Sequence, residues 1–221
     1  QASRAIALMF AGLTLAMVVG VPLGSLIGNG LGWRLPFFAV ALLAALGWLA
    51  TARWVPALPA QAAGRASTQL ATLVQPEILA MMSITILGFG ASFAAFTFIT
   101  PILTDITGFS THAASLLLMV FGTATLLGNF AGGRWAASLG WPVALRRMLA
   151  GLLLAFVALA LLMPWRAPMV LLLFAWGLLA FGMSPGFQAG MLATAGQWAP
   201  RAVDFASALN ISAFNLGITL G

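Results

Sequence analysis

Residues 169–192 read MVLLLFAWGLLAFGMSPGFQAGML, a stretch that contains no charged side chain. At 1.5 Å per residue, an α-helix of this length crosses the ~30 Å hydrocarbon core of a lipid bilayer. Its polar side chains, Ser184 and Gln188, are too few to give a soluble helix a solvated face. The stretch therefore predicts a membrane-spanning helix.

The rest of the chain repeats this pattern. Of its 221 residues, 62% are hydrophobic and 5% are charged, against roughly a quarter charged in soluble domains. Long apolar runs favour spanning helices over the short alternating strands of a membrane β-barrel. We expect an all-α polytopic membrane protein with the lipid bilayer as a partner. The expected spans are Ala5–Gly28, Pro36–Ala52, Ile78–Leu103, Ala113–Ala131, Leu145–Met163, Met169–Leu192 and Val203–Gly221.

The nine basic residues, all Arg, predict the orientation of these spans. When the connections are assigned alternately to two sides, one side holds seven Arg and the other holds only Arg34 and Arg166. Connections rich in Arg are typically cytoplasmic, so the N-terminal flank is expected in the cytoplasm. Because the Arg residues are scattered, the net charge of +6 does not indicate a nucleic-acid-binding patch.

Few residues could support catalysis or metal binding. The chain has no Cys, one His and three carboxylates, and none of these groups lies deep in an expected span. Thiol chemistry and disulfides are therefore excluded. We expect no metal, no cofactor and no enzymatic activity.

The longest connection, at residues 55–76, is the expected boundary between two helical bundles. It contains Pro56, Pro59 and Gly64, which disfavour a continuous helix. Its second part, Ser67–Val74, could form a short amphipathic helix on the membrane, although an ordinary loop explains the sequence equally well. The expected organisation is two spans in residues 1–54, a cytoplasmic linker in 55–76 and five spans in 77–221.

Small residues recur at every fourth position of the first expected span. Such residues lie on one face of a helix and let a neighbouring backbone approach closely. A plain packing face is the alternative to a functional one. The row consists of Gly12, Ala16, Gly20, Gly24 and Gly28, with Pro22 beside it.

This row carries a resemblance to a known family. The sequence GVPLGSLIGNGLGWR, at residues 20–34, resembles the antiporter motif in the fifth helix of Major Facilitator Superfamily exporters. It is especially similar to the drug-proton antiporter and sugar-efflux (arabinose-efflux-permease-like) branch. The resemblance implies a fold of twelve helices in two six-helix halves. On this interpretation the chain is a fragment that supplies helices five to eleven.

Two further stretches are similar to the same family. The first resembles the second-half copy of its cytoplasmic loop motif, which implies that loop glycines and charges gate the helix ends; Ala137 and Ser138 stand where an acid and a base are common. The second, Ile102–Ser110, resembles the outer turn after helix seven, where Asp105 is expected to order the turn. The loop-motif residues are Gly128, Asn129, Gly132, Gly133 and Arg134.

Neutral polar residues are the candidates for a substrate cavity. A buried carboxylate within a span would be the default functional group, so the coupling acid of a proton antiporter is expected in helices outside this sequence. The neutral side chains could line a cavity or could form hydrogen bonds between helices. The candidates are Ser92, Thr97, Gln188, Asn210 and Asn215.

These observations predict a secondary active transporter that exports a small molecule, such as a drug or a sugar, by proton-coupled alternating access. Its expected partners are the small-molecule substrate and protons, and it is expected to be a monomer in a bacterial inner membrane. The alternatives are a membrane-embedded enzyme, a non-transporting scaffold or sensor, and an inactive transporter fragment.

Overall fold

The computed structural model describes residues 12, 16–20, 23–24, 27–28, 32–56 and 66–221. The chain divides into two compact units, a smaller one assigned to residues 12–63 and a larger one that includes residues 64–221. The smaller unit contains the π-helix η1 (Ala16–Gly20) and α3 (Arg34–Trp54).

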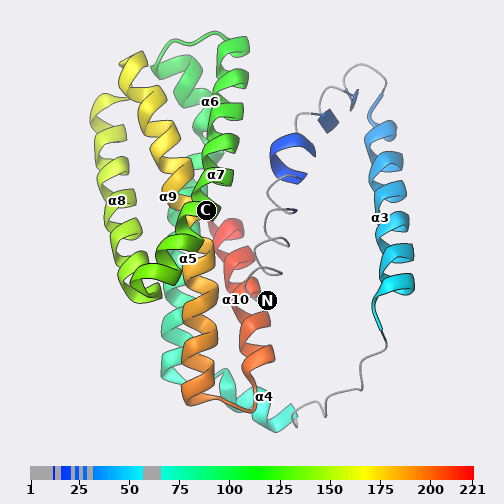
Figure 1. Cartoon of the computed structure of the whole chain (residues 1–221). Coiled ribbons are helices and arrows are strands. Elements are labelled where there is room, and N and C mark those ends of the chain that lie inside the picture. Colours follow the sequence, from blue (N-terminus) through cyan, green and yellow to red (C-terminus); the bar gives the residue numbers. More distant parts are fainter. Residues whose placement is uncertain (1–11, 13–15, 21–22, 25–26, 29–31, 57–65) are drawn as a thin grey trace. The chain divides into compact units, whose positions relative to one another are not determined.

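The larger unit is a bundle of helices, shown in Figure 1. Within the described ranges it contains helical elements and no β-strand. The elements are α4 (Ala66–Thr72), α5 (Pro76–Thr97), α6 (Ile99–Pro101), η2 (Ile102–Ile106), α7 (Thr111–Leu139), α8 (Trp141–Leu162), α9 (Arg166–Trp198) and α10 (Val203–Leu220).

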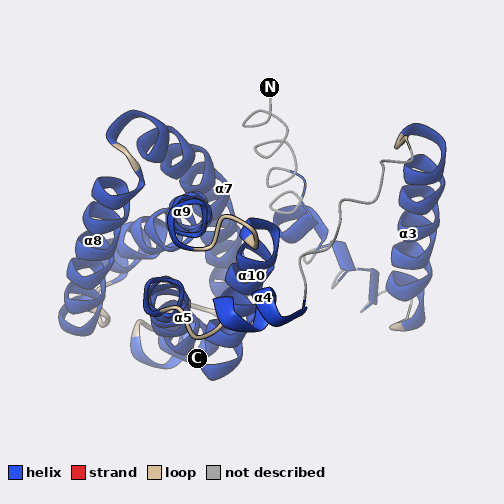
Figure 2. Cartoon of the chain, turned by 90° about the horizontal axis from the view of Figure 1, so that it is seen from below, coloured by secondary structure: helices blue, strands red, loops and turns tan. Residues whose placement is uncertain are grey.

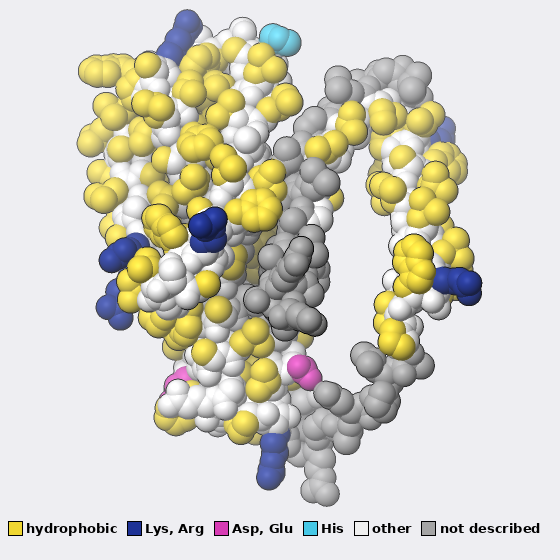
Figure 3. Space-filling view, viewed as in Figure 1, with side chains coloured by type: hydrophobic (Ala, Val, Ile, Leu, Met, Phe, Trp, Pro, Cys, Tyr) yellow, Lys and Arg dark blue, Asp and Glu magenta, His cyan; other side chains and the backbone are white. Residues whose placement is uncertain are grey.

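Six of the described helices, α3, α5, α7, α8, α9 and α10, are long and apolar enough to cross a membrane. They correspond to the last six predicted spans and confirm the all-α polytopic class. Apolar side chains cover most of the visible face of the bundle, and charged side chains are few (Figure 3). The first predicted span, Ala5–Gly28, lies largely outside the described residues.

Helix α9 lies at the centre of the larger unit, with α5, α7, α8 and α10 packed against it (Figure 2). Its fully buried side chains include Trp176, Met183, Phe187 and Met191. A helix that packs against neighbours on several sides needs apolar residues on all of these sides. This explains why the apolar residues of α9 are spread around the helix and do not form one narrow stripe.

The third predicted span, Ile78–Leu103, is not one continuous helix. α5 ends at Thr97, and the chain continues through Phe98 into α6 and the π-helix η2. Pro101 accounts for the break, because it has no N–H to donate to the Thr97 carbonyl and its ring crowds that carbonyl. In η2, the Thr107 N–H donates to the Ile102 carbonyl oxygen at 3.0 Å, a π-type bond.

The chain does not leave the helix after Ala131, where the fourth predicted span ends. α7 continues through Gly132, Gly133 and Arg134 to Leu139, because packing against α9 outweighs the low helix propensity of Gly. One residue, Gly140, then joins α7 to α8. Its φ of +79° belongs to a region that favours glycine, so a tight reversal is possible there.

The predicted short helix of the long connection is present as α4, at Ala66–Thr72 rather than Ser67–Val74. The Leu73 and Val74 N–H groups donate to the carbonyls of Leu70 and Ala71 in a tighter final turn. Pro76 then occupies the first position of α5, where its missing N–H costs little.

Candidate functional site

Gly128 and Gly132, two residues of the predicted loop motif, form a backbone contact between α7 and α9. Both are buried, and a methyl group added to either would overlap a backbone carbonyl of α9, at Leu178 or Gly182. A methyl group on Gly182 would lie 3.1 Å from the Gly128 carbonyl oxygen. Only glycine permits this approach of two backbones, so these residues pack helices together.

The other three loop-motif residues also lie on α7. Gly133 faces Pro185 of α9, since a methyl group on it would lie 3.9 Å from the proline Cγ. Asn129 is half-buried and Arg134 is exposed. The structure therefore places the motif in a helix, next to the proline of the long helix α9.

Two of the predicted cavity residues, Gln188 and Asn210, are joined by a hydrogen bond between α9 and α10. The Asn210 Nδ2 donates to Oε1 of Gln188 at 2.8 Å, and the Gln188 Nε2 donates to the Ser207 hydroxyl at 2.6 Å. At the other end, the Thr85 hydroxyl of α5 donates to Oδ1 of Asn210 at 3.0 Å. Thr85, Asn210, Gln188 and Ser207 form a chain of side chains across three helices, here called the polar network.

An apolar cluster lies next to the polar network. Its residues come from the same three helices and are almost completely buried. Interhelical hydrogen bonds in membranes contribute about 0.6 kcal/mol each on average, so the network adds modest stability and defines the relative register of the helices. The cluster consists of Ile78, Met81, Met191, Ala195 and Ala206.

The remaining candidates, Ser92, Thr97 and Asn215, do not join the network. Ser92 is buried inside the bundle on α5, with 3% of its surface exposed. Thr97 and Asn215 are exposed, and each donates to a carbonyl of its own helix, at Phe93 and Ile211. Ser92 and Asn210, 5% exposed, therefore do not line an open cavity in this conformation.

One face of α10 is exposed and polar. Ser212, Asn215 and Thr219 lie on it, as their spacing predicts, and Asn210 lies on the buried face. Each exposed side chain donates to the carbonyl four residues earlier, at 3.1, 2.9 and 2.9 Å.

The turn between η2 and α7 is held by residues that the sequence reasoning missed. The Thr107 hydroxyl donates to the Met163 carbonyl at 2.7 Å, and the Arg166 guanidinium donates to the Gly108 carbonyl. Arg166 also lies over the Phe109 ring, 5.4 Å from its centroid. Asp105, which was predicted to order this turn, is exposed. Its carboxylate accepts a hydrogen bond from the hydroxyl of its neighbour Thr104 at 2.7 Å.

The glycines of the antiporter motif have few described neighbours. Among the described residues, no atom lies within 4 Å of a methyl group placed on Gly12, Gly20 or Gly24, and one on Gly28 would meet Pro36 at 3.6 Å. Pro22 lies outside the described residues. The predicted packing role of this row therefore stays a prediction.

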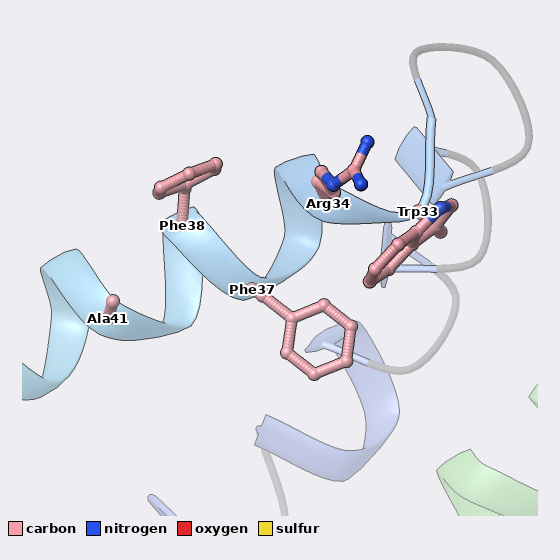
Figure 4. Close-up of a pocket in the computed structure, with 5 residues that line it drawn as sticks. All are labelled: Trp33, Arg34, Phe37, Phe38 and Ala41. Atoms are coloured by element: carbon pink, nitrogen blue, oxygen red, sulfur yellow. The ribbon is translucent and has the colours of Figure 1, made fainter.

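A hollow of about 300 Å³ lies on α3, in the smaller unit (Figure 4). Four of its five residues lie in the first turns of α3, Trp33 directly precedes them, and all five are exposed, so it is the outer face of a helix and not an enclosed site. Arg34 lies 4.7 Å from the centroid of the Trp33 ring. The lining residues are Trp33, Arg34, Phe37, Phe38 and Ala41.

Six apolar helices of spanning length define an integral multi-pass membrane protein, and the five of them in the larger unit are joined by glycine contacts and buried polar side chains. The sequence profile of the Major Facilitator Superfamily matches residues 1–221, so the chain belongs to this family.

Two relatives illustrate the relationship. The chain is 34% identical over 229 residues to the uncharacterized MFS-type transporter YtbD of Bacillus subtilis (strain 168), covering 99% of this chain and 55% of that protein. It is 33% identical over 225 residues to the inner membrane transport protein YdhP of Escherichia coli (strain K12), covering 100% and 55%. The chain thus spans about half the length of the curated relatives it matches.

Proposed function

We propose that this chain is part of a secondary transporter that exports a small molecule in exchange for protons. The observation that carries the proposal is the antiporter-like sequence at residues 20–34, in a chain that belongs throughout to a transporter family. The relative YdhP is named an inner membrane transport protein, which supports a bacterial inner-membrane location.

In alternating access, two helical halves rock against each other as rigid bodies. The closely packed larger unit suits the role of one such half. Residues 1–54 belong to the first half, residues 55–76 link the halves, and residues 77–221 belong to the second. The tight α7–α9 contact and the polar network hold the second half together as it moves. The exposure of Thr97 on α5 and of Asn215 on α10 supports a role for both in lining the substrate pathway.

The test is proton movement in proteoliposomes that contain the full-length protein. Addition of drugs, sugars and nucleobases, one at a time, should produce a substrate-dependent pH change inside the vesicles for at least one compound. Empty vesicles and a Gly24→Leu variant serve as controls, because the bulky side chain should block packing of the glycine row. If no compound moves protons through the wild-type protein, the antiporter proposal is wrong.

The orientation can be tested separately. We propose that Arg201 is cytoplasmic and Arg166 is on the opposite side, as the Arg asymmetry predicts. Single cysteines at these two positions, in an otherwise cysteine-free protein, should be labelled from opposite sides by a membrane-impermeant thiol reagent. Labelling of both from the same side would contradict the proposed orientation.

A further inference from the structure

The turn between α7 and α8 is flanked by three of the nine Arg residues of the chain. Arg134 lies six residues before Gly140, and Arg146 lies six residues after it, with Arg147 beside it. Because Gly140 alone separates the two helices, residues equally far from it lie at about the same level, roughly 9 Å from the turn. Dark blue side chains gather on this part of the bundle in Figure 3. The three Arg residues therefore share one end of the α7–α8 hairpin.

These three side chains have no anionic partner in the described part of the chain. Each is exposed, and none makes a hydrogen bond or an ion pair with a described residue. α7 and α8 contain no Asp or Glu, and the three carboxylates of the chain belong to α5, η2 and α10. Neighbouring like charges repel one another, so a bound anion would stabilise this end of the hairpin.

An exposed apolar row on α8 leads to the Arg residues. It begins at Arg147 and continues every three or four residues, so its members lie on one face of the helix. Lipid tails are as apolar as Leu side chains, so this exposed face suits contact with acyl chains. The row consists of Arg147, Ala150, Leu154, Val157 and Leu161.

Two observations indicate that the Arg residues lie at the membrane surface. The fifteen residues of α8 that follow Arg147 carry no charge, and they extend for roughly 22 Å, most of a ~30 Å hydrocarbon core. Trp135, the neighbour of Arg134, is exposed, and Trp is enriched at the level of the lipid headgroups. We therefore expect the three guanidinium groups at the level of the lipid phosphates.

We propose that Arg134, Arg146 and Arg147 form a binding site for the headgroup of an anionic phospholipid, whose acyl chains lie along the exposed row of α8. A guanidinium group presents a planar set of N–H donors that matches a phosphate. The net negative charge of the lipid offsets the positive charge of the three Arg residues, whereas a zwitterionic lipid carries no net charge. The site is independent of the transport activity proposed above and of its direction.

A lipid suits this place better than a soluble anion. A soluble phosphate would contact the Arg residues alone, whereas a phospholipid also places its acyl chains against the apolar row of α8. A headgroup anchored in the bilayer is in addition held beside the site, which gives it a high effective concentration. The shared phosphate chemistry makes the soluble ion the natural competitor in a test.

Native mass spectrometry of the purified full-length protein in detergent tests the proposal. Phosphatidylglycerol and phosphatidylcholine with the same acyl chains are titrated separately, and the affinity for the first bound lipid is compared. Each Arg near an anionic headgroup gives about a fivefold gain in affinity, so the three should favour phosphatidylglycerol by roughly 30- to 100-fold. Inorganic phosphate in large excess should not displace the bound lipid.

Substitutions at the three positions separate charge from structure. The triple variant Arg134→Gln, Arg146→Gln, Arg147→Gln should lose most of the preference for phosphatidylglycerol. The triple substitution of the same residues by Lys keeps the charge without the planar donor set, and it should keep the preference to within about fivefold. If the triple Gln variant does not fold, each single Gln substitution should lower the preference by about fivefold.

The matched control removes the same amount of charge elsewhere. The triple variant Arg34→Gln, Arg53→Gln, Arg201→Gln changes three exposed Arg residues that lie outside the α7–α8 hairpin. It should keep the wild-type preference, because these residues do not belong to the proposed site.

Four results would overturn the proposal. The wild-type protein could bind the two lipids equally well, or the triple Gln variant at the hairpin could keep the preference. An equal loss in the hairpin variant and in the control would show a general attraction between positive protein and anionic lipid. Displacement of the lipid by inorganic phosphate would show a site for soluble anions. A failed flux assay would refute the proposed transport function and leave this site untouched.

Discussion

Helices α3 and α9 look alike in sequence and differ in their surroundings. Each begins with an Arg that follows a Trp, and each ends with a Trp. Their most apolar windows have mean hydropathies of 2.0 and 1.9. Yet in the part of the chain that the structure describes, no residue of α3 is buried, whereas 44% of the α9 window is.

The two helices differ in their glycines. α3 contains one glycine, Gly47, and a methyl group placed there meets no described atom within 4 Å. α9 contains several glycines that lie against α5, α7 and α8, among them Gly177, Gly182, Gly186 and Gly190. Hydropathy shows that a helix enters the bilayer, while the glycines of α9 mark faces on which a neighbouring helix packs closely.

The largest effect is expected from Gly132→Ala in α7. The added methyl group overlaps the Gly182 backbone, which cannot move without separating α7 from α9. We expect the free energy of unfolding to fall by about 3 kcal/mol, the upper part of the range for overpacking. The measurement is the thermal unfolding midpoint of the full-length protein in detergent.

Gly47→Ala is the matched control for that variant. It makes the same change in the interior of α3, where no described atom lies within 4 Å of the added methyl group, and should raise helix stability by about 0.5–1 kcal/mol. Equal shifts of the midpoint in the two variants would show that the α7–α9 contact has no special role.

A smaller effect is expected from Asn210→Ala. The substitution removes two interhelical hydrogen bonds and leaves Thr85 and Gln188 without their shared partner. At about 0.6 kcal/mol for each bond in a membrane protein, the loss should be about 1–2 kcal/mol of unfolding free energy, measured by the same melts. Asn215→Ala, on the exposed face of the same helix, should change stability by less than about 0.5 kcal/mol. A larger loss for Asn215→Ala than for Asn210→Ala would contradict the structural assignment of the network.

The smallest effect is expected from Arg166→Gln at the start of α9. It removes bonds to the Thr107 and Gly108 carbonyls and a contact with the Phe109 ring, worth about 1 kcal/mol because the side chain is exposed. Hydrogen exchange of the Gly108–Ser110 amides should become faster. Arg34→Gln in α3 breaks a contact with its sequence neighbour Trp33, so no distant amide should respond. Unchanged exchange at Gly108–Ser110 in Arg166→Gln would contradict the proposal that Arg166 holds this turn.

The number and order of the described spans followed from hydropathy, because a helix in lipid must be long and apolar wherever it lies. Helix ends were harder to predict, since α7 continues past Arg134 and α8 begins before Arg146 and Arg147. A charged side chain marks where a helix leaves the hydrocarbon core. The backbone hydrogen bonds of the helix can continue beyond that residue. The break in α5 could have been predicted from Pro101.

The polar candidates were predicted in part. Gln188 and Asn210 attracted attention because a buried amide is costly, and the structure joins them. Thr85 and Ser207 were not chosen, since a hydroxyl in a helix can always bond to its own backbone. Which hydroxyl reaches a neighbouring helix depends on packing across 125 residues of sequence, and no local pattern contains that information.

The one-residue link at Gly140 has a consequence for biosynthesis. α7 and α8 are sequence neighbours with almost no slack between them, so we expect them to enter the bilayer together as a helical hairpin. The glycine face of α7 then stays uncovered until α9, the next helix to be synthesised, arrives beside it. Crosslinking of nascent chains stalled after Met163 should trap α7 against α8, and crosslinks from Gly128 to Leu178 should form only in longer chains.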